Sequence, residues 1–357
     1  MHIVEMLRRL ADRGPTPWPV LSVYVNTRPV GPQMTTYRPY LKTRASAELQ
    51  SFLAHTPERE SLTVDFARAQ HYLDFDLHEE TRSVAIFACY AGDDLFDAIQ
   101  MPIEVPHHLV VVGAVPTLFP LLRLADQASP AAVAVADTGV TRLFSIAMGA
   151  IVLRREVRPE EPSAAGASGL AARSARALAD LVRDSAAGGV VVGGDEAAAA
   201  AIKRQLSPAL APLLLDPATA DPQIAEPTLA AQVTALIETR GRAACIAQTR
   251  DLVAASSGLL GVDAVMAALR EDRAASLFLA EAFPAGVPAW ACRSCPEFGA
   301  GSPPATCPSC RRSAVEPVAL REELGARALV RRIPIHFVPT AAVPAFDDGG
   351  GVGALAR

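Results

Sequence analysis

Four cysteines in the last third of the chain form two closely spaced pairs, and this pattern restricts the local fold more than any other feature. The pairs are Cys292-Arg-Ser-Cys295 and Cys307-Pro-Ser-Cys310, separated by eleven residues. Two residues between paired cysteines allow a tight turn to direct both thiolates toward one ion, and zinc takes four such ligands in a tetrahedron. The spacing predicts one structural Zn2+ ion, with two disulfides or an iron–sulfur cluster as alternatives.

The residues around the cysteines favour a structural role for the ion. A complete shell of four thiolates leaves no coordination position for water or substrate. The segment between the pairs is rich in glycine and proline: Gly299, Gly301, Pro303 and Pro304. It buries too little apolar surface to fold alone, so we expect the ion to stabilise it. Arg311 and Arg312 are expected to form a solvated charged edge, with a phosphate contact as the alternative.

The remaining cysteines and the N-terminal residues indicate the compartment. Cys89 and Cys245 lie singly in apolar stretches, as buried thiols do. One cluster with two isolated thiols is typical of a reducing compartment rather than of a disulfide framework. The N-terminal residues lack the features of a signal peptide, and no apolar stretch approaches the roughly 20 residues that cross a bilayer. We expect a soluble, cytoplasmic protein with no membrane partner.

Composition limits the classes of partner further. Half of the 357 residues are hydrophobic and a fifth are charged, as in an ordinary folded protein of two or three domains. The formal net charge of −5 excludes a global attraction to nucleic acid. Contacts with RNA phosphates would have to come from local arginine clusters, because Lys42 and Lys203 are the only lysines.

Strands and helices alternate along the chain, which predicts an α/β fold with three α/β domains in series. Expected strands cover residues 20–25, 83–90, 94–100, 109–112, 131–137, 140–146, 151–157, 189–194, 274–280 and 331–338. Expected helices cover residues 1–13, 40–54, 61–73, 170–186, 196–205, 229–240, 242–254, 262–270 and 320–326. The intervening segment 159–169 is rich in small residues and is expected to be a mobile loop.

Proline-containing segments mark the expected domain boundaries. Ala128-Ser-Pro130 separates the first two domains, and a region with five prolines between residues 208 and 227 separates the second from the third. The predicted domains are residues 1–128, 129–221 and 222–357. The cysteines fall in a zinc-binding insertion at 288–315 of the third domain.

Other polar motifs carry weaker indications. Gly193-Gly194-Asp195 follows a strand and precedes a helix, but it lacks the Lys-Ser/Thr of a P-loop and the third glycine of a dinucleotide motif. We interpret it as close packing of a strand against a helix. His107-His108 has no neighbouring Glu or Cys motif, and the sequence contains no recognisable nucleophile–base arrangement.

One predicted helix carries arginines on a single face. Arg173, Arg176 and Arg183 lie at i, i+3 and i+10, and Asp180 can pair with Arg176 at i+4. Such a face is compatible with solvation or with phosphate contact, and the sequence leaves both open.

Three groups of motifs follow one another along the whole chain. The first contains Leu21-Ser-Val-Tyr-Val25, then Val105-Pro-His-His-Leu109 through Phe119-Pro-Leu-Leu122. The second contains Ala134-Val-Ala-Asp137 through Arg142-Leu-Phe144, then Val190-Val-Val-Gly-Gly194 with Lys203. The third contains Gly261-Val-Asp-Ala-Val-Met-Ala-Ala-Leu269, the four cysteines and Gly350-Gly-Val-Gly-Ala-Leu-Ala-Arg357. In this order they resemble the archaeal and eukaryotic peptide chain release factors and Pelota, in the bacterial branch that includes the hibernation factor Balon.

This resemblance implies a fold and a place on the ribosome. The first domain would approach the decoding site, and an RNase H-like central domain would reach toward the peptidyl-transferase centre. An L7Ae/L30e-like third domain with the inserted zinc knuckle would dock a translational GTPase such as EF-Tu. The rRNA of the A site would be the partner of five arginines at the outer tip of the central domain: Arg154, Arg155, Arg158, Arg173 and Arg176.

Two motifs of this family are missing. No Gly-Gly-Gln occurs, and the corresponding segment reads Pro162-Ser-Ala-Ala-Gly-Ala-Ser-Gly169. The turn between two first-domain helices reads Ala54-His-Thr-Pro-Glu-Arg-Glu-Ser61 in place of an Asn-Ile-Lys-Ser loop. The sequence therefore favours a non-hydrolytic factor that occupies the A site in hibernation or rescue, without enzyme activity. The alternatives are a peptidyl-tRNA hydrolase acting on stalled ribosomes and a zinc-stapled adaptor in a stress response.

Overall fold

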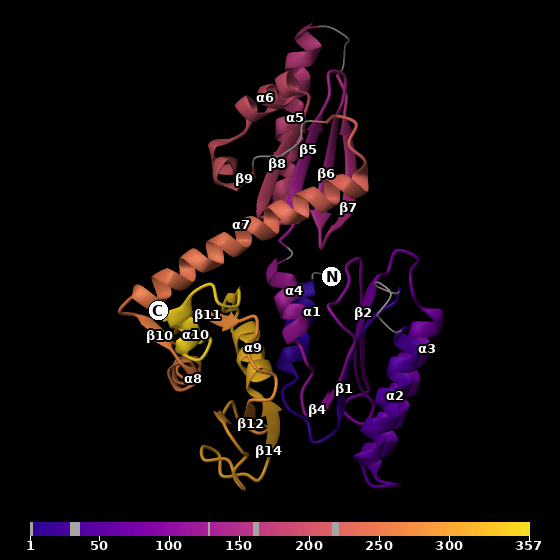
Figure 1. Ribbon diagram of the computed structural model, residues 1–357, viewed down its shortest axis with the longest axis vertical. Coiled ribbons are helices and arrows are strands. Elements are labelled where there is room, and N and C mark those ends of the chain that lie inside the picture. The colour runs from indigo at the N-terminus through magenta and orange to yellow at the C-terminus, as the bar shows by residue number, and fades with distance from the viewer. Residues whose placement is uncertain (1–2, 29–35, 128, 160–163, 216–220) are drawn as a thin grey trace. The chain divides into compact units, whose positions relative to one another are not determined.

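The computed structural model of the protein describes residues 3–28, 36–127, 129–159, 164–215 and 221–357. They form two compact units (Figure 1). The first unit combines Met1–Asp126 with Cys245–Arg357, and the second comprises Gln127–Ala244. Within the described ranges, both units contain strands and helices, with three sheets in the first unit and one in the second, which confirms the predicted α/β class. The division into three domains, and the RNase H-like and L7Ae/L30e-like assignments, stay predictions.

The N-terminal part of the first unit is an antiparallel sheet with two of its helices packed on one face. The strand order is β3-β2-β1-β4. The strands are β1 (Val20–Asn26), β2 (Ser83–Cys89), β3 (Leu95–Met101) and β4 (Leu109–Gly113). The helices are α1 (Ile3–Asp12), α2 (Tyr37–Gln50), α3 (Pro57–Phe75) and α4 (Phe119–Gln127). Alternate apolar residues of β1 and β2 pack against α2 and α3, because successive strand side chains point to opposite faces.

The C-terminal part of the first unit contains two more sheets. One has the order β10-β16-β11-β15, in which β11 and β15 run parallel and the other neighbours antiparallel. Its strands are β10 (Gly258–Leu260), β11 (Ala274–Ala280), β15 (Ile335–Val338) and β16 (Val352–Ala356). Its helices are α8 (Val262–Arg270), α9 (Leu320–Val330) and α10 (Pro344–Asp348). The other sheet has the order β13-β12-β14. Its strands are β12 (Pro288–Cys292), β13 (Phe298–Ala300) and β14 (Val315–Ala319), and we call residues 288–319 the cysteine ribbon.

Helix α4 joins the two parts of the first unit. The buried carboxylate of Glu322 accepts hydrogen bonds from the backbone N–H groups of Leu118 and Phe119, at 2.7 and 2.9 Å. These N–H groups lie at the start of α4, where a helix lacks internal acceptors, so Glu322 caps the helix from another element. The Arg321 guanidinium lies over the Phe119 ring, 4.6 Å from its centroid. We call these contacts the α4 junction.

The other end of α4 is attached to strand β15. The carboxylate of Asp126 accepts a hydrogen bond from the Phe337 N–H at 3.1 Å. The Cys245 thiol donates to the Phe337 carbonyl at 3.4 Å. The Phe337 backbone therefore bonds to Asp126, the last residue before the second unit, and to Cys245, the first residue after it.

The second unit is a five-stranded sheet covered on both faces. The order is β7-β6-β5-β8-β9, with β5, β8 and β9 parallel. The strands are β5 (Ala131–Ala136), β6 (Thr141–Ala147), β7 (Ala150–Val157), β8 (Gly189–Gly194) and β9 (Leu214–Leu215). Helices α5 (Ala164–Ser185) and α6 (Glu196–Gln205) cover one face, and α7 (Glu226–Ala254) covers the other. The short 3-10 helix η1 (Pro208–Leu213) precedes β9.

Several helices differ from the sequence expectation, three of them for reasons that the structure shows. The sequence predicts two helices on either side of Gly241, but α7 runs through it as one helix (Figure 1). A glycine costs a helix interior only about 1 kcal/mol, and its neighbours are good helix formers. Helix α5 begins at Ala164 rather than at Leu170, so part of the expected loop at 159–169 is helical, since alanine favours helix. Helix α3 begins at Pro57, because Thr56 accepts a capping hydrogen bond from Arg59 N–H.

Among the described residues, no helix is both long and apolar enough to cross a membrane.

Candidate metal centre

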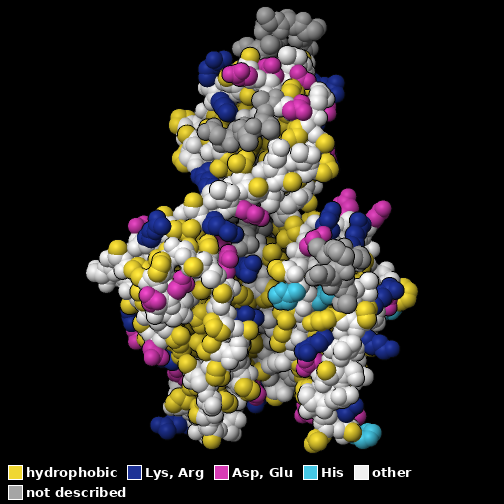
Figure 2. All heavy atoms as spheres, viewed as in Figure 1, with side chains coloured by type: hydrophobic (Ala, Val, Ile, Leu, Met, Phe, Trp, Pro, Cys, Tyr) yellow, Lys and Arg dark blue, Asp and Glu magenta, His cyan; other side chains and the backbone are white. Residues whose placement is uncertain are grey.

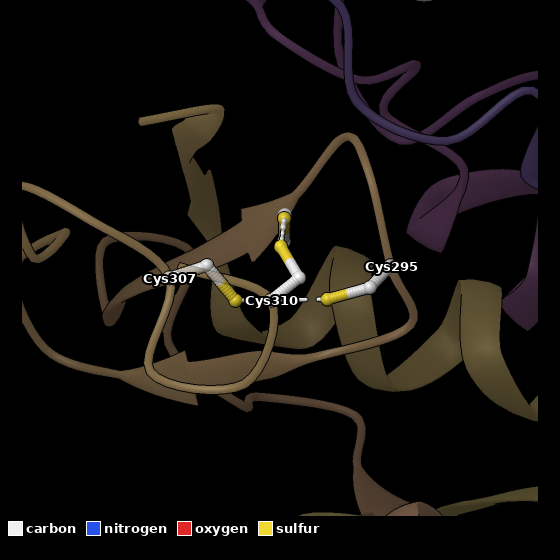
Figure 3. A group of neighbouring side chains, drawn as sticks. Cys295, Cys307 and Cys310 are labelled. Atoms are coloured by element: carbon white, nitrogen blue, oxygen red, sulfur yellow. Dashed lines mark hydrogen bonds between the residues drawn. The ribbon is translucent and has the colours of Figure 1, made fainter. Parts of the chain in front are cut away.

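The four cysteines are brought together by the strands and turns of the cysteine ribbon. Cys292 is the last residue of β12, and Cys295 lies in the turn that leads to β13. Cys307 and Cys310 lie in the loop that returns to β14. Because β12 pairs with both β13 and β14, the two cysteine pairs reach the same end of the small sheet. Figure 3 shows the sulfur atoms of Cys295, Cys307 and Cys310 directed toward one another.

The distances between the sulfur atoms fit a single tetrahedral ion. The Sγ atoms of Cys292 and Cys310 are 3.6 Å apart, as are those of Cys295 and Cys307. All four lie within 4.8 Å of one another. A tetrahedron with Zn–S bonds of about 2.3 Å has edges of about 3.8 Å, close to these values. A disulfide requires about 2.05 Å, so all four cysteines are free thiols here and a metal site is the better description.

The surroundings shift the pKa values of two of the four thiols in opposite directions. Burial opposes ionisation of Cys307, but backbone N–H groups of Cys310 and Ser309 donate to its sulfur, and its pKa falls to about 7. Burial and neighbouring thiols raise the pKa of Cys295 to about 12. A bound cation would favour deprotonation of all four ligands.

Local hydrogen bonds shape the two turns that carry the cysteines. The Ser294 N–H donates to the Cys292 sulfur at 3.3 Å, inside the first turn. In the second turn the Cys307 N–H donates to the Arg312 carbonyl at 2.8 Å, and the Arg311 N–H donates back to the Cys307 carbonyl at 2.9 Å. Arg311 has φ of 64°, the left-handed conformation that closes this turn. The Cys-x-x-Cys spacing therefore directs paired sulfurs inward, as expected from the sequence.

Two arginines attach the cysteine ribbon to the rest of the first unit. Their guanidinium carbons lie 5.3 Å (Arg270, from α8) and 4.9 Å (Arg327, from α9) from the centroid of the Phe298 ring. Arg270 also donates to the Phe298 carbonyl at 3.0 Å, and Arg327 donates to the Pro296 carbonyl at 2.9 Å. The buried carboxylate of Glu323 holds Arg327 at 2.6 Å. The sequence did not indicate these contacts, because they join residues about thirty positions apart.

A glycine completes the packing of the ribbon. A Cβ at Gly299 would lie 2.6 Å from atoms of the Trp290 indole, which packs directly across from it in the β12–β13 pair. The absence of a side chain at Gly299 thus lets the largest side chain of the ribbon lie flat on the neighbouring strand. The expected Gly/Pro-rich segment contains a structural glycine as well as turn residues.

The described residues thus place all four predicted ligands in one cluster that can hold a metal ion. The described cluster offers four sulfur donors and no oxygen or nitrogen donor, which matches a soft or borderline cation such as zinc. With every ligand position taken by protein, the ion would stabilise the ribbon and would not activate water.

The five arginines predicted to contact RNA all belong to the second unit, on strand β7, just after it, and on α5. Two of them pair with carboxylates: Arg154 with Glu226 at 2.7 Å, and Arg158 with Glu156 at 2.8 Å. Arg173 donates to the Arg158 carbonyl at 3.0 Å, which connects the middle of α5 to the residue that follows β7. Figure 2 shows basic side chains interspersed with acidic ones on the visible face of this unit.

The remaining two arginines are available to a partner. Arg155 and Arg176 are exposed, and neither forms an ion pair with any described residue. The expected pair of Arg176 with Asp180 is wrong, because the Asp180 carboxylate accepts from Arg183 instead. The i,i+3 position offered the shorter path to that carboxylate.

Two weaker motifs have structural roles. Asp195 caps α6 by accepting a hydrogen bond from the Ala198 N–H at 2.9 Å. A Cβ at Gly194 would lie 2.0 Å from the Ala136 carbonyl oxygen, so this glycine packs closely against strand β5 and not against a helix as predicted. His108 is buried, and its Nδ1 accepts a hydrogen bond from the Asn26 N–H at 3.2 Å.

Comparisons with known proteins find similarity in structure only. No protein-family model matches the chain, and no curated protein matches its sequence. The archaeal translation termination factor aRF1 aligns with 99% of this chain over 97% of its own length, at 13% identity and a TM-score of 0.28. Archaeal Pelota, in its ribosome-bound structure with ABCE1, aligns with 99% of this chain over 94% of its own, at 11% identity and a TM-score of 0.43.

A third similar structure comes from yeast. Dom34 of S. cerevisiae, a translation termination-like factor that interacts with Hbs1, aligns with 77% of this chain over 80% of its own length. Its sequence is 8% identical and the TM-score is 0.42. Similarity at such identities concerns the fold alone.

Proposed function

We propose that the protein is a release-factor-like, non-hydrolytic ribosome-binding factor that occupies the A site during hibernation or rescue in the cytoplasm. The observation that supports this best is the order of motifs in the sequence, which resembles release factors and Pelota from end to end and lacks Gly-Gly-Gln. A Gly-Gly-Gln tip positions water for peptidyl-tRNA hydrolysis in that family. Its absence supports occupation of the site without chemistry.

The arginines of the second unit are the proposed RNA contacts. Arg155 and Arg176 present exposed guanidinium groups, whose planar fork suits phosphate oxygens. Arg154, Arg158 and Arg173 lie close to them in the sequence or along β7 and α5, and would have to exchange their present partners to reach RNA. We therefore assign Arg155 and Arg176 the main share of the RNA affinity. A translational GTPase such as EF-Tu is the proposed partner of the C-terminal part.

Zinc is the proposed ion of the cysteine ribbon, with one ion per chain bound by Cys292, Cys295, Cys307 and Cys310. The sulfur-only donor set supports this identity over calcium or magnesium, which take oxygen ligands. Elemental analysis of the purified protein should give one zinc per chain and no iron. Iron with acid-labile sulfide would replace this assignment by an iron–sulfur cluster.

Co-sedimentation with ribosomes tests the proposed function. The full chain should pellet with vacant 70S ribosomes, and a ligand that fills the A site should displace it. The double variant Arg155→Gln, Arg176→Gln should bind at least tenfold more weakly and lose about two units of its log–log salt slope. The matched control, Arg242→Gln with Arg250→Gln, removes two exposed arginines of α7 and should bind like the wild type.

Two outcomes would replace the proposal. Single-turnover release of a nascent peptide from stalled complexes would make the protein a peptidyl-tRNA hydrolase, especially if deletion of residues 164–169 abolished it. Absence from 70S particles in starved cells, together with capture of a non-ribosomal complex, would favour the adaptor in a stress response.

A further inference from the structure

The second unit contains an apolar cavity between α7 and its sheet. Its volume of about 520 Å³ lies in the range of small-molecule sites. Its lining includes six aliphatic side chains of β5, β8 and α7: Val133, Val135, Val191, Leu229, Val233 and Leu236. We call it the α7 cavity.

Glycines in β8 explain why space remains beneath α7. Val191 points toward α7, and so do the positions two residues away on either side, Gly189 and Gly193. The Ile237 side chain fills the space over Gly189, where a Cβ would lie 2.2 Å from its Cδ1 atom. Gly193, by contrast, lines the α7 cavity. Among the described residues, a side chain of α7 fills the space over Gly189, whereas Gly193 faces the cavity.

A cationic side chain, Arg240, reaches the α7 cavity. It donates through Nη2 to the Pro212 carbonyl, whereas its Nη1 is shielded from solvent and has no acceptor among the described residues. A guanidinium stays charged in proteins, and its buried N–H groups require acceptors. A carboxylate matches such a donor, because it accepts charge-assisted hydrogen bonds from the guanidinium edge.

The carboxylate of Asp221 also lines the cavity, toward the other end of α7. Asp221 precedes the start of α7 at Glu226, whereas Arg240 lies in its second half. Leu229 and Arg240 are eleven positions apart, about 16 Å along a helix. Asp221 Oδ1 already accepts a hydrogen bond from the Gln223 N–H at 2.8 Å. The α7 cavity therefore has a cationic end, an apolar middle and a distant acidic end.

We infer that the α7 cavity binds a medium-chain alkyl carboxylate, with the carboxylate on Arg240 and the chain along the aliphatic side chains of the sheet and α7. An alkyl chain gains affinity from burial alone and needs no polar partner in the middle of the cavity. The carboxylate supplies the acceptor that Arg240 Nη1 lacks. This site is independent of ribosome binding and of the metal centre.

Calorimetric titration of the full, metal-loaded chain with hexanoate, octanoate and decanoate tests the inference. Affinity should rise about fourfold for each added methylene until the cavity is full, with one molecule bound per chain. Decanol, which has the same chain and no charge, should bind at least tenfold more weakly than decanoate.

Three variants test separately how the Arg240 charge and the apolar space of the cavity contribute to ligand binding. Arg240→Gln should weaken decanoate about tenfold or more and leave decanol unchanged, because only the charged contact is lost. Arg242→Gln removes the same charge from an exposed position of the same helix outside the cavity lining, and should alter neither. Leu236→Trp should exclude both ligands by filling the cavity. Circular dichroism would verify that each variant is folded.

Three results would overturn the inference. These are no saturable binding of any chain length, equal binding of decanol and decanoate, or decanoate affinity that is unchanged by Arg240→Gln. The first would mean that a water molecule is the acceptor for Arg240. The other two would mean that the α7 cavity has no carboxylate site.

Discussion

The cysteine ribbon and the sheet of the second unit are stabilised in different ways. The three strands of the ribbon have five, three and five residues, and long turns lie between them. The sheet of the second unit is covered on both faces by buried aliphatic side chains of its helices. Segments that bury little apolar surface depend on cross-links or metals, whereas an aliphatic core is stable without them. The two regions should therefore respond differently to loss of a metal.

The cysteine ribbon is nevertheless connected to the rest of the first unit. Phe298 lies between Arg270 and Arg327, and Arg327 belongs to α9. The same helix carries Glu322, which caps α4. Disturbance of the ribbon can therefore reach the α4 junction through one helix, and the size of the effect should decrease along this path.

Loss of the metal should have the largest effect. Substitution Cys307→Ser removes one of four ligands, and structural zinc sites contribute on the order of 10 kcal/mol to folding of small modules. We expect loss of bound zinc and of hydrogen-exchange protection in β12, β13 and β14. Protection of β5 and β8 in the second unit should stay unchanged, as measured by mass spectrometry.

The control for this experiment is Cys89→Ser, which changes a buried thiol far along the chain from the cluster. It should retain full zinc content. Protection of the cysteine ribbon that survives metal removal would contradict the comparison, since the ribbon would then be stable by packing alone.

The second effect concerns the α4 junction. Glu322→Ala leaves the Leu118 and Phe119 N–H groups without their acceptor and Arg321 without its partner. Removal of one member of a buried charged network costs about 3–5 kcal/mol, and we expect a loss of this order in the free energy of unfolding. Glu322→Gln keeps an acceptor oxygen and should cost less. Urea unfolding of the zinc-loaded chain measures both.

Two other results would change this interpretation of the α4 junction. Equal destabilisation by Ala and Gln would show that the negative charge matters, rather than the acceptor. An alanine variant as stable as the wild type would mean that α4 is held by its apolar contacts. In either case the zinc content should be normal, because the ligands are intact.

The third effect concerns protonation of a buried carboxylate and does not depend on the metal. Burial raises the pKa of Asp65 to about 6, although one oxygen accepts a hydrogen bond from the Tyr90 N–H. The folded state then binds more protons than the unfolded state between pH of about 4 and 6, so stability falls as pH rises through this window. The pKa of Asp65 in the folded state lies about two units above its ordinary value, which corresponds to at most about 3 kcal/mol in the free energy of unfolding. Asp65→Asn is neutral throughout and should be more stable than the wild type at pH 7.

Denaturant unfolding of both proteins from pH 4 to 7 tests this sign. The difference between their free energies of unfolding should grow with pH and level off above about 6. Zinc loss at low pH affects both proteins equally, because both carry the same cysteines, and so cancels in this difference. A constant difference would show that Asp65 titrates normally. The pKa of Asp126 also rises to about 6 through burial, so a residual slope should persist in Asp65→Asn.

The metal centre could be predicted from the sequence because its geometry is local. Cys-x-x-Cys fixes the direction of two sulfurs within one turn, and Cys307 and Cys310 needed only a short sheet to meet the first pair. The α4 junction could not be predicted. Its carboxylate and the N–H groups it accepts from are more than 200 positions apart, and no periodicity joins Glu322 to Phe119.

The arginines illustrate an intermediate case. Helical spacing placed Arg173 and Arg176 near each other, but it did not predict that Arg173 would donate to the Arg158 carbonyl or that Asp180 would pair with Arg183. Arg154 pairs with Glu226, which is 72 positions away and begins a different helix. Most strands were predicted from alternating or continuous apolar residues. Strands β9, β10, β16 and those of the ribbon were missed because they are short and carry few β-branched residues.

The backbone of Phe337 marks the place where the second unit is inserted into the first. The chain leaves the first unit at Asp126 and re-enters it at Cys245, and both residues bond to the same peptide neighbourhood, one through the Phe337 N–H and the other through its carbonyl. An excursion of more than a hundred residues therefore starts and finishes at nearly one point. The second unit can therefore be treated as an insertion into the first. Replacing it by a short flexible connector should leave a first unit that folds, and other domains could be inserted at the same point.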